Sequence, residues 1–167
     1  MNPALLARVG PDGLMRFQGR VYRCALGKGG LSAEKREGDG STPIGLLPLR
    51  RLLYRADRLA PPQASVAIAP IAPEDGWCDD PTHADYNQQI RLPHPARHEI
   101  LWRADHIYDV IGTLGWNDAP VARGRGSAIF LHLARPGFAP TEGCVALERQ
   151  DLLQVLRDGL VAIEVFT

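Results

Sequence analysis

The sequence lacks any long apolar run. No segment approaches the roughly 18 consecutive apolar residues of a transmembrane helix, so we expect no membrane span. The N-terminal segment Met1–Asp12 has neither the basic start nor the apolar stretch of a secretory signal peptide. We therefore expect a cytoplasmic protein. A periplasmic location is the alternative if a signal peptide has been removed from the chain.

The chain also lacks net charge, because its 19 basic and 19 acidic residues cancel. A protein without a basic excess has no general electrostatic attraction to nucleic acid or to an anionic membrane. We therefore expect neither as a partner. The three cysteines are too few, and odd in number, for a disulfide framework.

Glycine patterns that bind nucleotide phosphates are absent. Cys78 with His83, and His94 with His98, have spacings that suit zinc. Neither pair is accompanied by a matching second pair, which a structural zinc site needs. We expect no metal and no other cofactor.

Turn-forming residues are abundant, with 17 glycines and 14 prolines, and they favour short strands. The length of 167 residues suits one domain with a substantial core. We predict a single domain, residues 1–167, that is mostly β with one or two short helices, built as a β-sandwich or a partly closed barrel. The expected helices span 148–158, ending at Gly159, and 95–105, starting at Pro95. Apolar patterns predict a hairpin over 14–26 and strands over 46–54, 66–71, 107–114 and 161–166, with Pro48 indicating an edge or a bulge.

The stretch from Gly126 to Leu147 organises the chain. It predicts a buried strand that ends at His132, a Pro/Gly loop, and a second strand opened by Gly143 and Cys144. A thiol and an imidazole then lie at neighbouring strand ends, where the imidazole can take the thiol proton and form an ion pair with the thiolate.

This arrangement predicts a catalytic role for Cys144, His132 and Gly143. Cys144 would be the nucleophile, and His132 the general base that later protonates the leaving group. The backbone amides of Gly143 and Cys144 would stabilise the oxyanion. The alternative is a buried apolar cysteine beside a core histidine.

Three segments resemble the L,D-transpeptidase catalytic domain (YkuD-like) family. The stretch Thr141-Glu-Gly-Cys-Val145, preceded by His132, resembles the Ser/Thr-x-Gly-Cys signature of that family. The stretch 38–45 resembles its Thr-Pro-x-Gly turn, and 108–111 resembles the strand before its histidine strand. The resemblance covers roughly residues 20–160 and implies a fold of the L,D-transpeptidase catalytic type.

Members of this family form acyl-enzymes with peptidoglycan stem peptides, so the resemblance implies that stem peptides or muropeptides are the partners here. Cys144 would attack the carbonyl of the third-residue diamino acid and release the terminal D-amino acid. Hydrolysis of the thioester would make the protein an L,D-carboxypeptidase that trims terminal D-Ala in murein recycling, which the expected cytoplasmic location favours. Transfer to an acceptor amine would make it an L,D-transpeptidase that forms cell-wall cross-links. Acylation of the cysteine by β-lactams such as carbapenems is a further implication.

A non-catalytic module that binds wall peptides is the alternative from another class. The presence of both Cys144 and His132 argues against it.

The sequence departs from the family pattern at several positions. Leu133 stands where many members have glycine, Glu142 where many have histidine, and Ala146 where many have arginine. The loop between His132 and Cys144 is also shorter than in the best-known members of the family. We expect a backbone carbonyl near Leu133 or Ala134 to orient the imidazole.

The missing arginine leaves recognition of a substrate carboxylate open. Arg125, Arg135 and Arg91 are the candidates to supply the charge, because a guanidinium group binds a carboxylate through two hydrogen bonds.

The polar and aromatic segment 75–89 is expected to lack regular structure and to line the site. The alternative is an ordered loop whose side chains satisfy its own backbone. The predicted substrate-binding residues are Trp77, Tyr86, Asn87, Arg125, Ser127, Thr141 and Glu142.

Overall fold

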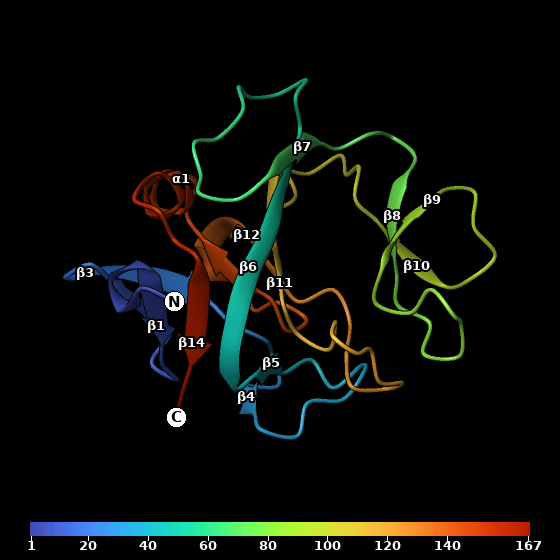
Figure 1. Ribbon diagram of the computed structural model, residues 1–167, viewed down its shortest axis with the longest axis horizontal. Coiled ribbons are helices and arrows are strands. Elements are labelled where there is room, and N and C mark those ends of the chain that lie inside the picture. The colour runs from blue at the N-terminus through green and yellow to red at the C-terminus, as the bar shows by residue number, and fades with distance from the viewer.

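Eight strands of the computed structural model, which describes residues 1–167, close into a barrel (Figure 1). Strand β6 pairs with β11 to close the ring, and β7 (Ile68–Pro70) adds to β6 outside it. The mostly β fold class predicted from the sequence is confirmed. The order around the ring is β11 (Val110–Leu114), β12 (Phe130–Leu133), β13 (Val145–Leu147), β3 (Arg20–Ala25), β2 (Leu14–Phe17), β1 (Leu6–Val9), β14 (Ala162–Val165) and β6 (Gly45–Tyr54).

The barrel is filled by a cluster of 22 buried residues. Helix α1 (Arg149–Arg157) contributes Leu152, Val155 and Leu156 to this cluster. The Glu148 side chain accepts a hydrogen bond from the amide of Gln150 (2.9 Å) and so caps the helix start. The helix predicted over 148–158 is confirmed. No helix of the structure is long and apolar enough to cross a membrane.

Strands β12 and β13 run parallel, with His132 opposite Ala146. Cys144 directly precedes β13 and lies two residues before Ala146. Because side chains alternate between the two faces of a strand, His132 and Cys144 share one face of the sheet. That face is outside the barrel core, since the core takes up the alternate residues of both strands, Leu131, Leu133, Val145 and Leu147.

A three-stranded sheet covers part of this outer face and lies to the right of the barrel in Figure 1. It consists of β10 (His98–Ile100), β8 (Asp75–Cys78) and β9 (Gln89–Arg91). A second apolar cluster that includes Tyr108, Phe130 and Cys144 lies beneath it, and the Trp77 ring packs edge-on against Phe130 with centroids 5.0 Å apart. Short elements complete the chain: the pair β4 (Leu31–Ser32) and β5 (Thr42–Pro43), and the 3₁₀ turns η1 (Pro3–Leu5) and η2 (Pro136–Phe138).

Two details of the predicted secondary structure are wrong. The helix predicted over 95–105 is absent, because β10 forms there and pairs with β8. Strand β8 lies within 75–89, where we expected no regular structure, and it pairs with β10 on one edge and with β9 on the other.

Pro48 was predicted to mark an edge strand or a bulge. Strand β6 is not an edge strand, since it pairs with both β14 and β11. A register shift between β6 and β11 lies close to Pro48, between the pair of Arg51 with Thr113 and the pair of Leu49 with Leu114, and agrees with the bulge alternative.

The Asp109 side chain contacts basic residues from separate parts of the fold. Its carboxylate is 1% exposed and accepts a hydrogen bond from Arg58 Nη1 at 2.7 Å. His106 Nδ1 lies 2.9 Å away and Arg149 Nη1 3.8 Å away. The start of β11, the loop after β6 and the start of α1 therefore meet at one buried charge.

We expect Asp109→Ala to lower the free energy of unfolding by about 3–5 kcal/mol, because it leaves partly buried cations without their counter-charge. Urea denaturation followed by circular dichroism measures the loss. The control is Asp12→Ala, which removes an exposed ion pair with Arg16 and should cost far less. Equal losses in the two variants would contradict a central role for Asp109.

Candidate active site

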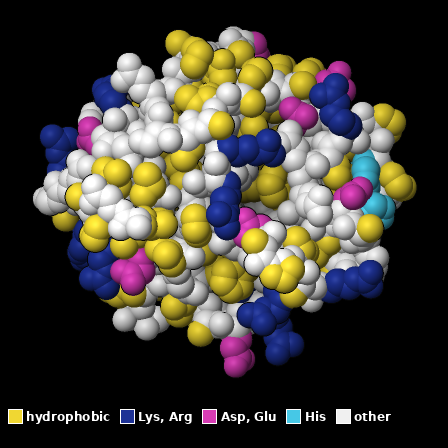
Figure 2. All heavy atoms as spheres, in the orientation of Figure 1, with side chains coloured by type: hydrophobic (Ala, Val, Ile, Leu, Met, Phe, Trp, Pro, Cys, Tyr) yellow, Lys and Arg dark blue, Asp and Glu magenta, His cyan; other side chains and the backbone are white.

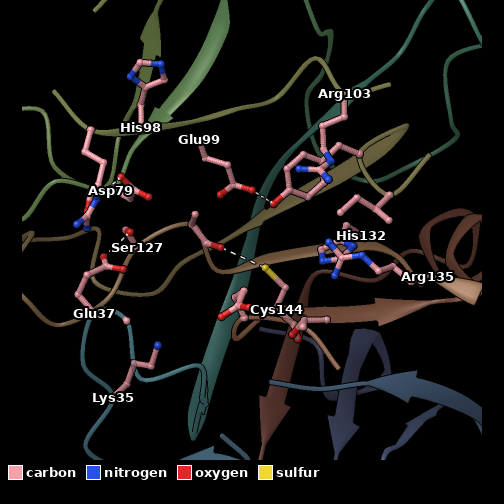
Figure 3. Close-up of a pocket in the computed structure, with 17 residues that line it drawn as sticks. Lys35, Glu37, Asp79, His98, Glu99, Arg103, Ser127, His132, Arg135 and Cys144 are labelled. Atoms are coloured by element: carbon pink, nitrogen blue, oxygen red, sulfur yellow. Dashed lines mark hydrogen bonds and ion pairs between the residues drawn. The ribbon is translucent and has the colours of Figure 1, made fainter. Parts of the chain in front are cut away.

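Cys144 and His132 line the same pocket, which has a volume of about 500 Å³. Figure 3 shows the thiol and the imidazole projecting into it from the ends of neighbouring strands. Charged side chains from the segments around 35, 79, 99 and 135 form much of the wall. The pocket thus brings together the two residues predicted to be catalytic.

The Cys144 thiol is a buried, neutral group in this structure. Its Sγ donates a hydrogen bond to the carbonyl of Ala128 (3.2 Å) and accepts one from the amide of Phe130 (3.3 Å). Burial, and next the charge of Glu99, raise the pKa of the Cys144 thiol to about 12. The structure contains no hydrogen bond between the Cys144 thiol and the His132 imidazole, and the raised pKa disfavours the thiolate–imidazolium pair expected from the sequence.

The His132 imidazole is held by its own backbone. Its Nδ1 lies 2.9 Å from the carbonyl oxygen of Leu133, which can only accept, so Nδ1 carries the proton and Nε2 is free to take one. This contact confirms that a backbone carbonyl near Leu133 or Ala134 orients the ring. Burial lowers the pKa of His132 to about 4, outweighing the carbonyl of Leu133, which raises it. The imidazole is thus a neutral base at neutral pH.

The turn before Cys144 is fixed by Thr141. The Thr141 hydroxyl donates to the carbonyl of Cys144 (2.7 Å) and accepts from the amide of Gly143 (3.1 Å). The Gly143 amide is therefore not free, and its predicted role as an oxyanion donor is wrong for this conformation. The amide of Cys144 makes no hydrogen bond and is the donor that remains.

The position of Gly143 demands glycine. Its φ is +139°, and a Cβ there would lie 2.7 Å from the carbonyl oxygen of Ser41. No larger residue fits without displacing the backbone of the 41–43 segment. The glycine that precedes the cysteine thus serves the close packing of two loops.

Ser127, Thr141 and Glu142 line the pocket as predicted for substrate-binding residues. Glu142 is exposed and forms an ion pair with Lys28 at 2.9 Å. The Ser127 hydroxyl donates to Glu37 (2.5 Å). Of the three, Glu142 is exposed and held only by a surface ion pair, whereas Ser127 and Thr141 would have to give up hydrogen bonds inside the fold to bind a ligand.

Trp77, Tyr86 and Asn87, which we predicted to bind substrate, do not line this pocket; Trp77 and Asn87 line a separate hollow. Asn87 Oδ1 instead accepts hydrogen bonds from Trp77 Nε1 and from the amide of Ala128, each at 3.0 Å. The Tyr86 hydroxyl donates to Glu37 (2.7 Å). These residues form a supporting layer, and Asn87 holds the residue whose carbonyl binds the Cys144 thiol.

Of the three candidate arginines, only Arg135 lines the pocket. Arg91 is 73% exposed beside Asp75, and Arg125 lines a separate hollow. The sequence reasoning missed other charged residues of the wall, because no spacing in the sequence links the small sheet to the His–Cys strands. They include Lys35, Glu37, Asp79, Arg97, Glu99 and Arg103.

Glu99 and Tyr108 form a hydrogen-bonded pair across from the thiol. The Tyr108 hydroxyl donates to Glu99 Oε1, and the Tyr108 ring packs edge-on against His132 with centroids 5.3 Å apart. Burial raises the pKa of Glu99, and the Tyr108 hydroxyl opposes this. Glu99 with Arg135 gives the pocket groups that can bind both an ammonium and a carboxylate.

His83, Asp85 and His94 form a cluster whose ligand atoms lie within 4.8 Å of one another. Histidine side chains are visible on the surface over the small sheet in Figure 2. The Nδ1 atoms of His83 and His94 accept hydrogen bonds from the amides of Asp85 (3.0 Å) and Ala96 (3.1 Å). Both rings therefore carry their proton on Nε2, where His94 donates to Asp85 (3.0 Å). The contacts describe a hydrogen-bonded cluster rather than open metal ligands.

Comparison with protein families gives a match over most of the chain. The model of the YkuD family, the L,D-transpeptidase catalytic domain, matches residues 12–160. No curated protein and no solved structure matches the chain.

The neutral thiol leads to a prediction about alkylation. Only the thiolate reacts with iodoacetamide, so the rate constant for Cys144 should rise about tenfold per pH unit from pH 7 to pH 9. Mass spectrometry of digested protein after timed labelling measures each cysteine separately. A rate that is constant between pH 6 and pH 8 would instead show a preformed ion pair.

The supporting role of Asn87 leads to a second prediction. Asn87→Ala leaves four partly buried groups without this partner, so it should lower the free energy of unfolding by at least about 2 kcal/mol. They are the amide of Ala128, Trp77 Nε1 and the carbonyls of Trp116 and Asn117. The substitution should also alter the labelling rate of Cys144, although Asn87 does not touch the thiol. Thermal unfolding and iodoacetamide labelling at pH 8 measure the two effects.

Asn87→Asp is the matched control, because it keeps the acceptor for Ala128 and loses the donor to the carbonyls of Trp116 and Asn117. It should preserve the labelling rate better than Asn87→Ala does. Equal labelling rates in Asn87→Ala and the wild type would show that Asn87 does not position the thiol.

Proposed function

The chain belongs to the L,D-transpeptidase catalytic domain family, whose cysteine enzymes act on peptidoglycan, and we propose that it is an L,D-carboxypeptidase. The substrate would be a tetrapeptide stem, from which the enzyme removes the terminal D-Ala. One observation carries the proposal: Cys144 and His132 share a charged pocket, with the imidazole Nδ1 fixed on Leu133.

Acylation would begin from the neutral pair. When the stem enters, the thiol gives up its hydrogen bond to Ala128, and His132 Nε2 takes the thiol proton as Sγ attacks the carbonyl of the third residue. Proton transfer at the moment of attack removes the need for a stable thiolate, which burial of Cys144 disfavours. The free amide of Cys144 would then donate to the oxyanion.

Collapse of the tetrahedral intermediate would break the bond to the terminal residue. His132, now protonated, delivers its proton to the departing amine nitrogen, and D-Ala leaves. The stem remains attached to Cys144 through a thioester. The low pKa of His132 makes the imidazolium a strong acid for this step.

The pocket suits a substrate that carries both signs of charge. A diamino acid at the third position bears an amine, for which Glu99 is the acidic partner, and the stem bears carboxylates, for which Arg135 is a cation without an acidic partner. Arg97 and Arg103 are less available, because they pair with Asp79 (3.1 Å) and Asp105 (2.6 Å).

Water would resolve the thioester, with His132 Nε2 acting as its general base. The wall around the thiol is rich in charged groups, which retain water within reach of the acyl carbonyl. This polar wall is the reason to favour hydrolysis.

Transpeptidation is the second candidate, and a neighbouring groove favours it. This groove of about 610 Å³ meets the pocket at Ile107 and Arg135 and is lined by apolar groups that include Leu133 and Phe138. A second stem could lie there with its amine directed toward the thioester.

The decisive experiment is mass spectrometry of a disaccharide-tetrapeptide incubated with the protein, with and without an added D-amino acid. We expect loss of D-Ala alone, since water is the proposed acceptor. Exchange of the terminal residue or dimer formation would instead establish transpeptidation. A carbapenem should add its full mass to Cys144 through the same chemistry.

Cys144→Ala should abolish turnover and the carbapenem adduct, and His132→Ala should lower turnover at least about 10²-fold. Cys78→Ala is the control, because Cys78 belongs to β8 of the small sheet, is fully buried in a separate apolar cluster with Ile90 and Ala96, and does not line the pocket. Full turnover in Cys144→Ala would reject the proposal.

A further inference from the structure

A second hollow, of about 490 Å³, adjoins the catalytic pocket. The loop 33–36 forms one wall and the loop 123–125 the other, and Lys35 belongs to the linings of both cavities. Three arginines line this hollow: Arg36, Arg123 and Arg125. We call it the arginine hollow. Arg125, which the sequence predicts to bind substrate, thus lies in this hollow and not in the pocket of Cys144.

These three arginines lack acidic partners. Many arginines pair with carboxylates, as Arg50 does with Asp118 (2.9 Å), whereas Arg36, Arg123 and Arg125 take part in none of the ion pairs of the structure. Other arginines, such as Arg20 and Arg135, are also unpaired. What distinguishes these three is that they line the same hollow.

The acidic residues of the same loop are already engaged. Glu37 accepts hydrogen bonds from the hydroxyls of Tyr86 (2.7 Å) and Ser127 (2.5 Å). Asp39 pairs with Lys35 and accepts from the amide of Arg36 (2.8 Å). Glu34 is the one carboxylate in the lining. Three arginines against one acid leave an excess of two positive charges once the Lys35–Asp39 pair is set aside.

The two walls are fastened to each other and to the barrel. The amide of Glu37 donates to the carbonyl of Gly124 (2.8 Å) across the gap. Asn117 Nδ2 donates to the carbonyls of Ala122 and Gly126, each at 2.9 Å, and so fixes both ends of the second loop. Trp116 Nε1 donates to the carbonyl of Arg125 (2.8 Å). A backbone fixed in this way reduces the entropy lost when a ligand binds.

We propose that the arginine hollow binds a diphosphate group. A diphosphate carries at least two negative charges at neutral pH and so can neutralise the excess of two positive charges, whereas a single carboxylate would leave one uncompensated. A guanidinium group also matches phosphate oxygens through two parallel hydrogen bonds. The diphosphate has two possible sources: a free ligand, such as pyrophosphate or a nucleoside diphosphate, or the sugar diphosphate of a stem-peptide precursor whose peptide reaches Cys144 past Lys35. The second source rests on the proposed function.

The first experiment is calorimetric titration of the full chain with inorganic pyrophosphate. Wild-type protein should bind it saturably, and Arg123→Gln and Arg125→Gln should each weaken binding at least about tenfold, because each removes a charge-assisted contact. The control is Arg20→Gln, which makes the same change in net charge at an exposed position of β3 and should leave the affinity unchanged. Absence of saturable binding at millimolar pyrophosphate, or equal affinity in all variants, would overturn the proposal.

The second experiment distinguishes the sources. If the diphosphate belongs to the substrate, a tetrapeptide stem carrying a sugar diphosphate should have a KM at least about tenfold lower than the same stem without it, and Arg125→Gln should remove the difference. Equal KM values would overturn the substrate-linked source and assign the hollow to a free diphosphate. The titration does not depend on catalysis. If the protein cleaves the stem but does not bind pyrophosphate, only the diphosphate site is rejected. If it binds pyrophosphate but does not cleave the stem, only the proposed function is rejected.

Discussion

The parallel pairing of β12 with β13 is the constraint on which the site depends. It places His132 opposite Ala146 and therefore puts Cys144 on the same face, two residues earlier. The barrel core enforces this register, because a shift by one residue would turn Leu131 and Val145 out of the core and the imidazole into it. The geometry of the Cys144–His132 pair thus follows from burial of the alternate side chains.

The surroundings of the thiol favour its neutral form. Burial removes water from both Cys144 and His132, raising the pKa of the first and lowering that of the second. The carbonyl of Ala128 gives the protonated thiol a partner, and Asn87 holds Ala128 in turn. A buried neutral thiol is protected from oxidation and from stray electrophiles, since the thiolate is the reactive species. Reactivity would then arise when a substrate displaces the bond to Ala128.

The sequence predicted those parts of the molecule whose structure is determined by a local pattern of residues. The alternating patterns predicted most strands, and Glu148 with the amphipathic segment after it predicted α1. The pair Cys144 and His132 was identifiable because both residues border apolar strands. The ring-orienting carbonyl of Leu133 could also be expected, since a histidine at a strand end lies near its own backbone.

The remaining features depend on long-range packing that no local pattern encodes. Segment 75–89 has the composition of a loop, yet β8 forms within it because β9 and β10 supply partners on both edges. Asn87 belongs to the same segment, whose composition suggested a binding role. Its side chain instead points into the fold and accepts a hydrogen bond from the amide of Ala128. Glu99 became part of the pocket only through the strand pairing that replaced the expected helix. The charges that surround the thiol thus come from a sheet whose existence is itself a tertiary effect.

The surface around the thiol has two regions that differ in their balance of acidic and basic side chains, and therefore in the ligands they suit. The pocket around Cys144 contains both acidic and basic side chains, and most of the basic ones pair with acidic ones. It would therefore distinguish ligands by the arrangement of their charges more than by their net charge. In the arginine hollow, the acids are engaged elsewhere and the sum is positive. Lys35 is 3% exposed and lies between the two, neutralised by Asp39. None of the residues that line the hollow contacts the Cys144 thiol, so binding there would act on substrate affinity more than on the chemical step.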